Sequence, residues 1–300
     1  MKVLVTGGAG FIGSHIVDLL IDEGYQPVVV DNLSTGNLGF LHEKVPFYKE
    51  NITSSNLEAI FAKERPDIVI HHAAQVDVSQ SIQNPYDDAV SNIIGTIQLL
   101  DCCIKFKVKK FIYASSCAVY GDAGDLSINE GYPIQPISFY GISKYTPELY
   151  IKRFQQLYGL TYTILRYANV YGPRQTPKGE GGVVSIFREQ LKDNKQPIIF
   201  GDGQQTRDFV YVKDVARANI LALKKGQNEI FNIGCNTKTN INDLFKLMNT
   251  MTKKQLLPKY KPQRKEDIRF SQLNNNKATQ LLGWKPKYDL TSGLEDTIFD

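Results

Sequence analysis

The sequence predicts an α/β fold built on an open, doubly wound parallel sheet, followed by a smaller mixed α/β part. Short apolar runs typical of buried parallel strands alternate with helical patterns in the first half of the chain. A glycine-rich turn directly follows the first of these runs and opens a helix. The alternation loosens near residue 173. We therefore expect one domain over 1–172, with return segments near 206–234, and a second over 173–300.

The first strand and its turn are the most specific feature of the chain. The turn Gly7-Gly8-Ala9-Gly10 follows Val3-Leu4-Val5, and apolar residues recur at helical spacing from Phe11 onward. Glycines allow the backbone to approach a pyrophosphate, and the helix start offers its N–H groups to that anion. Asp31 ends the next strand, where a carboxylate accepts from both ribose hydroxyls and repels a 2′-phosphate. The stretch predicts a dinucleotide site that favours NAD over NADP.

Length and composition are those of an ordinary globular enzyme. The chain has 300 residues, 42% of them hydrophobic and 22% charged, and its net charge is +4 with both signs intermixed. No nucleic-acid footprint follows from that balance, and no apolar run is long enough to span a bilayer. Met1-Lys2 leads directly into a strand, which leaves no room for a signal peptide. Four cysteines give no disulfide framework and no metal spacing. We expect a cytoplasmic protein without a bound metal, a nucleic-acid partner or a membrane partner.

Three further strands end in residues suited to a cofactor, because ligands bind outside the carboxyl ends of strands in such sheets. The strands are expected over 47–49, 67–71 and 111–114, and the residues that follow them are Asn51, Ile52, Ala73, Ala74, Ser115 and Ser116. The amide of Asn51 is placed to reach an adenine edge, and small residues after the second strand let a cofactor lie close. His71 and His72 are tempting acid–base groups. No carboxylate stands at triad or metal spacing, so we interpret both as strand-end residues that bond to backbone.

Helical patterns separate these strands and continue beyond them. Helices are expected over 56–64, 86–106 and 140–158, followed by a strand over 161–165. In the second half, glycines at 181–182 open another helix, a short strand covers 198–200, and a helix over 215–223 leads to a strand near 231–234. The last helix is expected from Asn275 to about Leu282.

Tyr140 and Lys144 are four residues apart and therefore share one face of their expected helix. A free tyrosine has a pKa of about 10 and is a poor base at neutral pH. A neighbouring ammonium and a positive nicotinamide ring stabilise the phenolate and lower that pKa. The spacing also occurs by accident between two surface residues. Its position after the Ser115-Ser116 strand end, in a chain with the glycine turn, favours an acid–base pair.

The chain resembles the extended short-chain dehydrogenase/reductase family, and within it the nucleotide-sugar 4-epimerases of the UDP-glucose 4-epimerase kind. The resemblance covers nearly the whole chain. The motifs that carry it are Gly7-Gly8-Ala9-Gly10-Phe11-Ile12-Gly13, Asp31-Asn32, His72-Ala73-Ala74, Asn92 with Gly95-Thr96, Ser115-Ser116, Tyr140-Gly141-Ile142-Ser143-Lys144, Arg166-Tyr167-Ala168-Asn169, Arg207-Asp208 and Arg264 with Asp267.

The resemblance implies a Rossmann-type domain whose bound NAD is reduced and reoxidised within one turnover, and a second domain for the nucleotide sugar. It makes Tyr140 the base at the 4-hydroxyl, Ser116 the hydroxyl that orients that oxygen, and Lys144 the residue that tunes Tyr140 and binds ribose. The implied cofactor contacts are Gly7, Gly10, Phe11, Ile12, Gly13, Asp31, Asn32, Asn51, Ile52, Ala73, Ala74, Asn92, Ser115, Tyr140, Lys144 and Tyr167. The implied substrate contacts are Ser116, Tyr140, Asn169, Val183, Phe200, Arg207, Arg264 and Asp267. Family members are often homodimers through the helix from Pro85 and the helix of Tyr140.

Departures from the family pattern refine the function. Related dehydratases and decarboxylases carry acidic side chains where this chain has Cys117-Ala118, which favours simple epimerisation. Asn51 replaces a usual aspartate beside adenine. Ser271, four residues past Asp267, is a small side chain that the family associates with room for a 2-N-acetyl group. UDP-GlcNAc and UDP-GalNAc are therefore candidate substrates beside UDP-Glc and UDP-Gal.

Two other functions stay open from the sequence. One is another nucleotide-sugar modification, such as uronate epimerisation or decarboxylation. The other is a non-catalytic NAD-binding sensor, because a fold does not fix a function. Retention of Ser116, Tyr140 and Lys144 together argues against the sensor.

Overall fold

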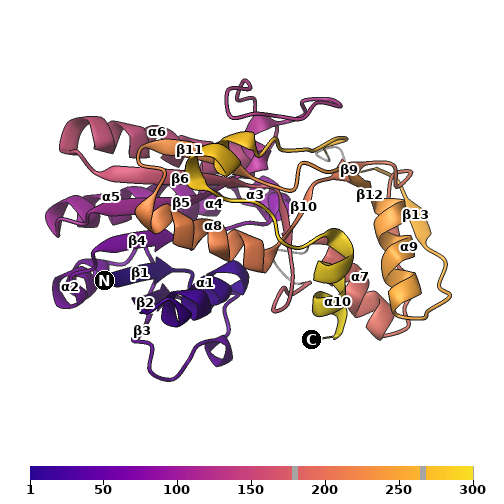
Figure 1. Ribbon diagram of the computed structural model, residues 1–300, viewed down its shortest axis with the longest axis horizontal. Helices are drawn as coiled ribbons and strands as arrows, with labels where there is room; N and C mark the ends of the chain where they lie inside the picture. The colour runs from indigo at the N-terminus through magenta and orange to yellow at the C-terminus, as the bar shows by residue number, and fades with distance from the viewer. Residues whose placement is uncertain (178–181, 264–267, 300) are drawn as a thin grey trace.

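A parallel sheet forms the centre of the computed structural model, which describes residues 1–177, 182–263 and 268–299 (Figure 1). In this described chain the sheet has seven strands in the order β11-β6-β5-β4-β1-β2-β3. All of its neighbouring strands pair in parallel. The predicted doubly wound sheet is confirmed. Its strands are β1 (Lys2–Thr6), β2 (Gln26–Asp31), β3 (Phe47–Lys49), β4 (Ile68–His71), β5 (Lys110–Ser116), β6 (Thr161–Tyr167) and β11 (Glu229–Ile233).

The sheet is buried on both faces because its strands are apolar at successive positions. Val3 and Val5 of β1 belong to one hydrophobic cluster, and Leu4 between them belongs to another. Side chains alternate across a strand, so the two clusters lie on opposite faces. Helices α1 (Phe11–Asp22) and α8 (Val212–Lys224) cover the first face. Helices α2 (Leu57–Glu64), α5 (Gly95–Lys105) and α6 (Phe139–Tyr158) cover the second.

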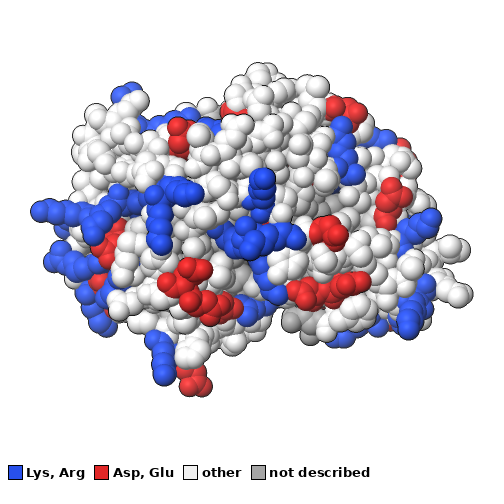
Figure 2. Space-filling view, viewed as in Figure 1, with Lys and Arg blue, Asp and Glu red and all other residues white. Residues whose placement is uncertain are grey.

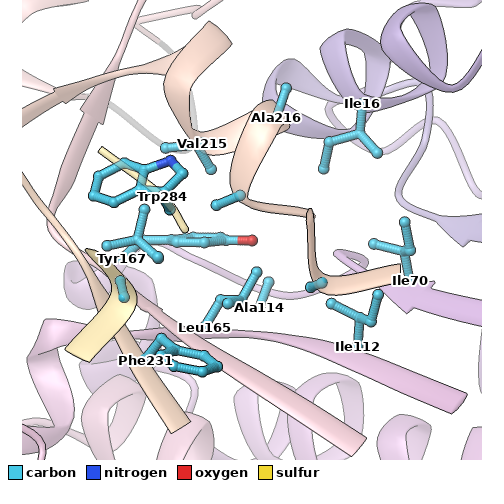
Figure 3. Close-up of a cluster of buried hydrophobic side chains, with 14 of the residues drawn as sticks. Ile16, Ile70, Ile112, Ala114, Leu165, Tyr167, Val215, Ala216, Phe231 and Trp284 are labelled. Carbon is cyan, nitrogen blue, oxygen red and sulfur yellow. The ribbon is translucent and has the colours of Figure 1, made fainter. Parts of the chain in front are cut away.

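The first cluster draws on distant parts of the chain (Figure 3). Ile70 and Ile112 from the sheet, Ile16 from α1 and Val215 from α8 contribute to it, together with Trp284 from near the C-terminus. Trp284 is fully buried, and its indole Nε1 donates to the carbonyl oxygen of Asp214 at 2.8 Å. Through Trp284, the segment near the C-terminus packs against α8 and the first face of the sheet.

Some helices of the second half of the chain lie together at one end of the molecule, and the others pack with the sheet (Figure 1). Helices α7 (Val183–Lys192), α9 (Ile241–Met251) and α10 (Leu290–Phe299) share a third hydrophobic cluster. Three small strand pairs accompany them: β7 (Asn169–Tyr171) with β10 (Phe209–Tyr211), β9 (Thr206–Arg207) with β12 (Thr239–Asn240), and β8 (Ile198–Phe200) with β13 (Lys259–Lys261).

The structure differs from the predicted elements in four places. The expected helix over 86–106 is three successive segments: α4 (Pro85–Ala89), a π-helical turn (Val90–Ile94) and α5. The expected last helix is a π-helical turn (Ala278–Leu282) preceded by a short helical segment, and α10 follows it. Two helices were not predicted, α3 (Val78–Gln83) and α9. Two short 3-10 helices complete the secondary structure, Leu38–Phe40 and Cys117–Tyr120.

Surface charge is intermixed on the face shown in Figure 2, where basic and acidic side chains alternate instead of segregating into one patch. Within the described residues, no helix is both long enough and apolar enough to cross a membrane. Among the described residues, no group of three or more His, Cys, Asp and Glu side chains is arranged to hold a metal ion.

Candidate active site

A cleft of about 600 Å³ lies at the carboxyl ends of the sheet strands. Strand order reverses between β1 and β4, and open α/β sheets bind ligands at such a switch point. The loops after β1, β2, β3 and β4 line the cleft together with the ends of β5 and β6 and the start of α6. The predicted residues among its lining are Gly7, Gly10, Phe11, Ile12, Gly13, Asp31, Asn32, Asn51, Ile52, Ala73, Ala74, Ser115, Tyr140, Lys144 and Tyr167.

Two glycines of the first turn are required by geometry. Gly7 has φ +68°, and a Cβ there would lie 2.6 Å from the backbone nitrogen of Ala73. A Cβ on Gly13 would overlap the carbonyl oxygen of Gly7. Helix α1 begins directly after this turn, and Gly10 at its N-cap provides no side-chain hydrogen bond. The first N–H groups of a helix have no partner within it, so they point at an anion placed over the turn. The residues present fit a dinucleotide pyrophosphate.

Asp31 braces this turn as well as lining the cleft. Its Oδ2 accepts from the backbone nitrogen of Ala9 at 3.0 Å, and its Oδ1 accepts from that of Leu33 at 2.8 Å. Burial raises the pKa of the Asp31 carboxyl, while the two backbone donors lower it. Each carboxylate oxygen has a further lone pair, so the brace leaves acceptor capacity for ribose hydroxyls.

Helix α6 presents Tyr140 and Lys144 to the cleft one turn apart. Ser138 caps the helix and accepts from the nitrogen of Gly141 at 3.1 Å, which fixes the first turn that carries Tyr140. Lys144 is 4% exposed, and its Nζ lies 4.8 Å from the ring centroid of Tyr113. Burial lowers the pKa of Lys144 to about 8, while the carboxylates of Asp88 and Glu148 raise it. A pKa this close to neutral pH means that the loss of a nearby negative charge would deprotonate Lys144.

The two serines at the end of β5 have different surroundings. Ser115 lines the cleft, but its Oγ donates to the buried carboxylate of Glu148 at 2.6 Å. Ser116 caps the 3-10 helix that follows, and its Oγ accepts from the nitrogen of Ala118 at 3.2 Å. Ser116 lies beside the lining of this cleft and not in it.

Asn92 lies behind the cleft wall. It is 2% exposed, its Oδ1 accepts from the nitrogen of Gln75 at 2.8 Å, and its Nδ2 donates to the oxygen of Gln75 at 2.9 Å. Through these bonds it holds the loop after β4, and that loop does line the cleft. Asn92 is therefore connected to the cleft through the residues it bonds to and not by direct contact with the space inside.

The ring nitrogens of both histidines have side-chain partners, whereas the prediction gave them backbone partners. His71 is 2% exposed, and its ring nitrogens lie 2.7 Å from Thr6 Oγ1 and 2.9 Å from Thr96 Oγ1. His72 lines the cleft, stacks on Tyr167 and lies 3.3 Å from Asn219 Oδ1. Burial holds the pKa of His71 well below its usual value and lowers that of His72 to about 4. Both rings are neutral at pH 7.

The predicted substrate residues come from the C-terminal elements. Asn169 opens β7, Val183 opens α7, Phe200 ends β8 and Arg207 ends β9. Arg207 is close enough to Cys117, the residue after Ser116, to lower the pKa of that thiol, although burial raises it overall. Ser271 also reaches Cys117, with Oγ and Sγ 3.9 Å apart. Arg264 and Asp267 lie outside the described residues.

The lining also includes residues that were not predicted. Among them are Gln75 from the loop after β4, Gln80 from α3, Asp87 from α4, and Val90 and Ser91 from the π-helical turn. One signal for α3 was present in the sequence. Asp77 is followed three positions later by Gln80, a helix-start pattern, and its side chain does accept from the nitrogen of Gln80 at 3.0 Å.

The fold and this cleft define a dinucleotide-binding enzyme with a tyrosine–lysine pair. Residues 3–234 match the model of the NAD dependent epimerase/dehydratase family. The chain belongs to this family, which confirms the resemblance seen in the sequence and NAD as the cofactor.

Similar proteins are known in detail. The UDP-glucose 4-epimerase of Mycolicibacterium smegmatis is 37% identical over 99% of this chain and 97% of its own. The crystal structure of the UDP-glucose 4-epimerase of Thermotoga maritima with UDP-glucose is 50% identical, covers 100% of this chain and 98% of that one, and has a TM-score of 0.98. The Thermus thermophilus UDP-glucose 4-epimerase in complex with NAD is 37% identical, with the same coverage and a TM-score of 0.95.

Proposed function

We propose that this protein is a UDP-hexose 4-epimerase that interconverts UDP-glucose and UDP-galactose with bound NAD through a transient 4-keto sugar. The observation that carries the proposal is that Tyr140 and Lys144 line the same cleft as the glycine turn and Asp31. The similarity to UDP-glucose 4-epimerases over almost the full chain supports the substrate class.

The chain's own residues divide the acid–base work. NAD, when bound, supplies a hydride acceptor and donor. The Tyr140 phenolate takes the proton from the 4-hydroxyl and is regenerated when the proton is returned, and the Lys144 ammonium stabilises this phenolate. The backbone nitrogen of Ala118 donates to Ser116 Oγ, which orients that hydroxyl for a hydrogen bond to the 4-oxygen. Because the sugar must turn over between the two hydride transfers, binding energy has to come from the nucleotide, and Asn169, Val183, Phe200 and Arg207 are proposed for it together with Arg264 and Asp267.

The residues beside Ser116 favour a roomy sugar subsite and no acid–base chemistry beyond Tyr140. Cys117 and Ser271 face each other with small side chains, 3.9 Å between Sγ and Oγ. Neither is a carboxylic acid of the kind that elimination needs. We propose that UDP-GlcNAc and UDP-GalNAc are accepted beside the unacetylated pair.

The test is incubation of purified protein with UDP-galactose, followed by chromatographic separation and mass measurement of the product. Epimerisation gives UDP-glucose with no change in mass, whereas a decarboxylase or dehydratase changes the mass of its product. Tyr140→Phe should abolish turnover and keep NAD binding, and Tyr158→Phe, an exposed tyrosine of the same helix, should leave turnover intact. Binding of NAD with every UDP-sugar unchanged would favour the sensor.

We propose a homodimer formed by the helices from Pro85 to Lys105 and by α6. Their surface carries exposed apolar side chains at Ile94, Ile142 and Leu149, each about half exposed. Apolar side chains gathered on neighbouring helices are typical of an interface. Light scattering of the purified protein should give twice the chain mass, and Ile142→Glu with Leu149→Glu should give the mass of one chain.

We also propose a two-part division of labour, with 1–172 and the return segments near 206–234 binding NAD and 173–300 binding the nucleotide sugar. The separate hydrophobic cluster shared by α7, α9 and α10 supports the second unit. A cytoplasmic location is proposed from the four unpaired cysteines, two of which are buried.

A further inference from the structure

A buried carboxylate lies behind the cleft and has no part in the chemistry assigned above. Asp88 of α4 is 1% exposed. Its Oδ1 accepts from Gln75 Nε2 at 2.8 Å and from Asn92 Nδ2 at 3.2 Å. Charged side chains are rarely buried to this degree unless a partner compensates them. The groups around Asp88 therefore indicate the role of its carboxylate.

Asp88 is connected to the helix that carries Tyr140 by a chain of hydrogen bonds. Asn92 Nδ2 also donates to Ser143 Oγ at 2.9 Å, and Ser143 Oγ donates to the carbonyl oxygen of Tyr140 at 3.1 Å. Asn92 stands at the middle of the π-helical turn between α4 and α5. Such turns interrupt helices mostly at functional sites. The turn places one amide between Asp88, the Gln75 loop and α6.

The hydrogen bonds from Asp88 through Asn92 reach Ser143, the residue before Lys144, so the buried carboxylate and the buried ammonium belong to one cluster. The pKa of Lys144 is lowered to about 8 by burial, and Asp88 is the strongest of the charges that raise it, ahead of Glu148. Glu148 is itself neutralised by Arg166, whose Nη2 lies 2.6 Å from Glu148 Oε2. The carboxylate of Asp88 accepts from two neutral amides instead.

Tyr113, His71 and His72 also surround Lys144, and they carry no negative charge at neutral pH. Tyr113 of β5 lies under the ammonium, and burial raises the pKa of its phenol well above the usual value. His71 of β4 and His72 of the loop that follows it are kept neutral by burial, and the charge of Lys144 lowers the pKa of each further. Tyr140 faces the same cleft from the preceding turn of α6.

We propose that Asp88 is a positioning residue that keeps Lys144 protonated and, through Asn92, fixes the Gln75 loop against the turn of α6 that carries Tyr140. The proposal rests on the proposed function, in which Lys144 works as an ammonium. Burial alone already weakens the charge of Lys144, so a chain without the Asp88 carboxylate loses that charge near neutral pH. In such a chain, a neutral Lys144 no longer stabilises the phenolate of Tyr140.

The test measures the protonation of Lys144 directly. The protein without nucleotide is labelled briefly with acetic anhydride between pH 6 and 10, and mass spectrometry gives the extent of labelling of the peptide that contains Lys144. Wild-type protein should show a midpoint near pH 8. Asp88→Asn should lower it by more than about half a pH unit, because this variant removes a carboxylate that raises the pKa of Lys144. The control variant is Asp101→Asn. It removes an exposed carboxylate from α5 and should leave the midpoint unchanged.

Two more variants separate charge from packing. Asp88→Glu keeps the charge and changes the shape, so it should retain the wild-type midpoint within about half a unit even if it lowers stability. Asp88→Ser removes the charge with a smaller side chain and is measured in parallel, so the test stands if Asp88→Asn fails to fold. An unchanged midpoint in both neutral variants, or an equal shift in Asp88→Glu, overturns the proposal.

Turnover of UDP-galactose gives a second readout. The alkaline limb of the kcat profile should move to lower pH in Asp88→Asn, with the larger loss above pH 7.5 and a smaller one near pH 6.5. A loss of equal size at every pH would show a purely structural role and overturn the proposal. The labelling experiment needs no turnover, so a failure of the proposed epimerase activity is distinguishable from a failure of this inference.

Discussion

Replacing Glu148 by glutamine should destabilise the protein strongly, because it strands a buried cation beneath the active site. Glu148 is fully buried and Arg166 is 2% exposed. The guanidinium grips the carboxylate with two bonds, Nε to Oε1 at 2.9 Å and Nη2 to Oε2 at 2.6 Å. Ser115 Oγ donates a third bond to Oε1. Arg166 also donates to the hydroxyl of Tyr120 at 2.8 Å.

The magnitude follows from burial. Glutamine keeps the volume and one acceptor, but it removes the counter-charge of Arg166. Breaking a buried ion pair on one side costs about 3–5 kcal/mol, because the remaining charge stays uncompensated. One of the two Arg166 bonds now meets an amide N–H₂ donor instead of an acceptor, which adds to the cost of an unsatisfied group. We therefore expect Glu148→Gln to lower the free energy of unfolding by about 4 kcal/mol.

Urea denaturation at pH 7.5, followed by tryptophan fluorescence and circular dichroism, measures this change. The control is Lys195→Gln, which breaks an exposed pair with Asp193 and should leave the urea midpoint unchanged. Glu148→Leu combined with Arg166→Met removes both charges and should cost less than Glu148→Gln alone. A loss below about 1 kcal/mol in Glu148→Gln, the range of surface pairs, would refute the reasoning from burial.

Two further predictions concern a glycine of the cleft and a buried histidine. Gly7→Ala places a Cβ 2.6 Å from the nitrogen of Ala73 and should weaken NAD binding at least about tenfold by calorimetry, since about 1.4 kcal/mol of strain suffices. Gly24→Ala has a similar φ of +76° and open space, so it should lose stability without losing NAD; equal losses of affinity would count against the close-approach argument. Burial holds the pKa of His71 below that of the unfolded chain, so the stability it contributes is present above pH 6.5 and lost as pH falls below that value. His71→Gln should narrow the gap between urea midpoints at pH 7.5 and 5.0, and exposed His42→Gln should leave the gap as it is; an unchanged gap in His71→Gln would contradict the argument.

The parts of the fold that sequence predicts well are those with one dominant physical cause. A strand such as β1 or β4 is buried on both faces, so its apolar run is continuous and bounded by glycine or by polar residues. The glycine turn is readable because only glycine fits where Gly7 and Gly13 stand. Asp31 follows because its position is set by the length of one helix and one strand. The same logic fixed Tyr140 and Lys144, whose spacing is one helical turn.

Two elements, helix α9 and the π-helical turn Val90–Ile94, were not predicted, and the reasons differ. Helix α9 carried a signal that went unused: Asn240 caps it by accepting from the nitrogen of Asp243 at 2.7 Å, and Ile241, Leu244, Phe245 and Met248 recur at helical spacing. The π-helical turn Val90–Ile94 has no comparable signature. Its apolar residues fit a continuous helix equally well, so the extra residue in the turn is visible only when Asn92 has its partners around it.

The site itself shows where local sequence reasoning ends. Motif spacing identifies the residues that touch a ligand, because these lie within a few positions of a strand end. It does not identify the residues that set their charge, because those are brought close only by the packing of helices. Asp88 and Lys144 are 56 positions apart in the sequence. Glu148 of α6 pairs with Arg166 of β6, a strand that follows it in the chain. Burial makes the charge of Lys144 marginal, so its protonation depends on the carboxylates packed around it. A tyrosine–lysine pair transplanted to another helix without such carboxylates should therefore keep its geometry and lose its acid–base function near neutral pH.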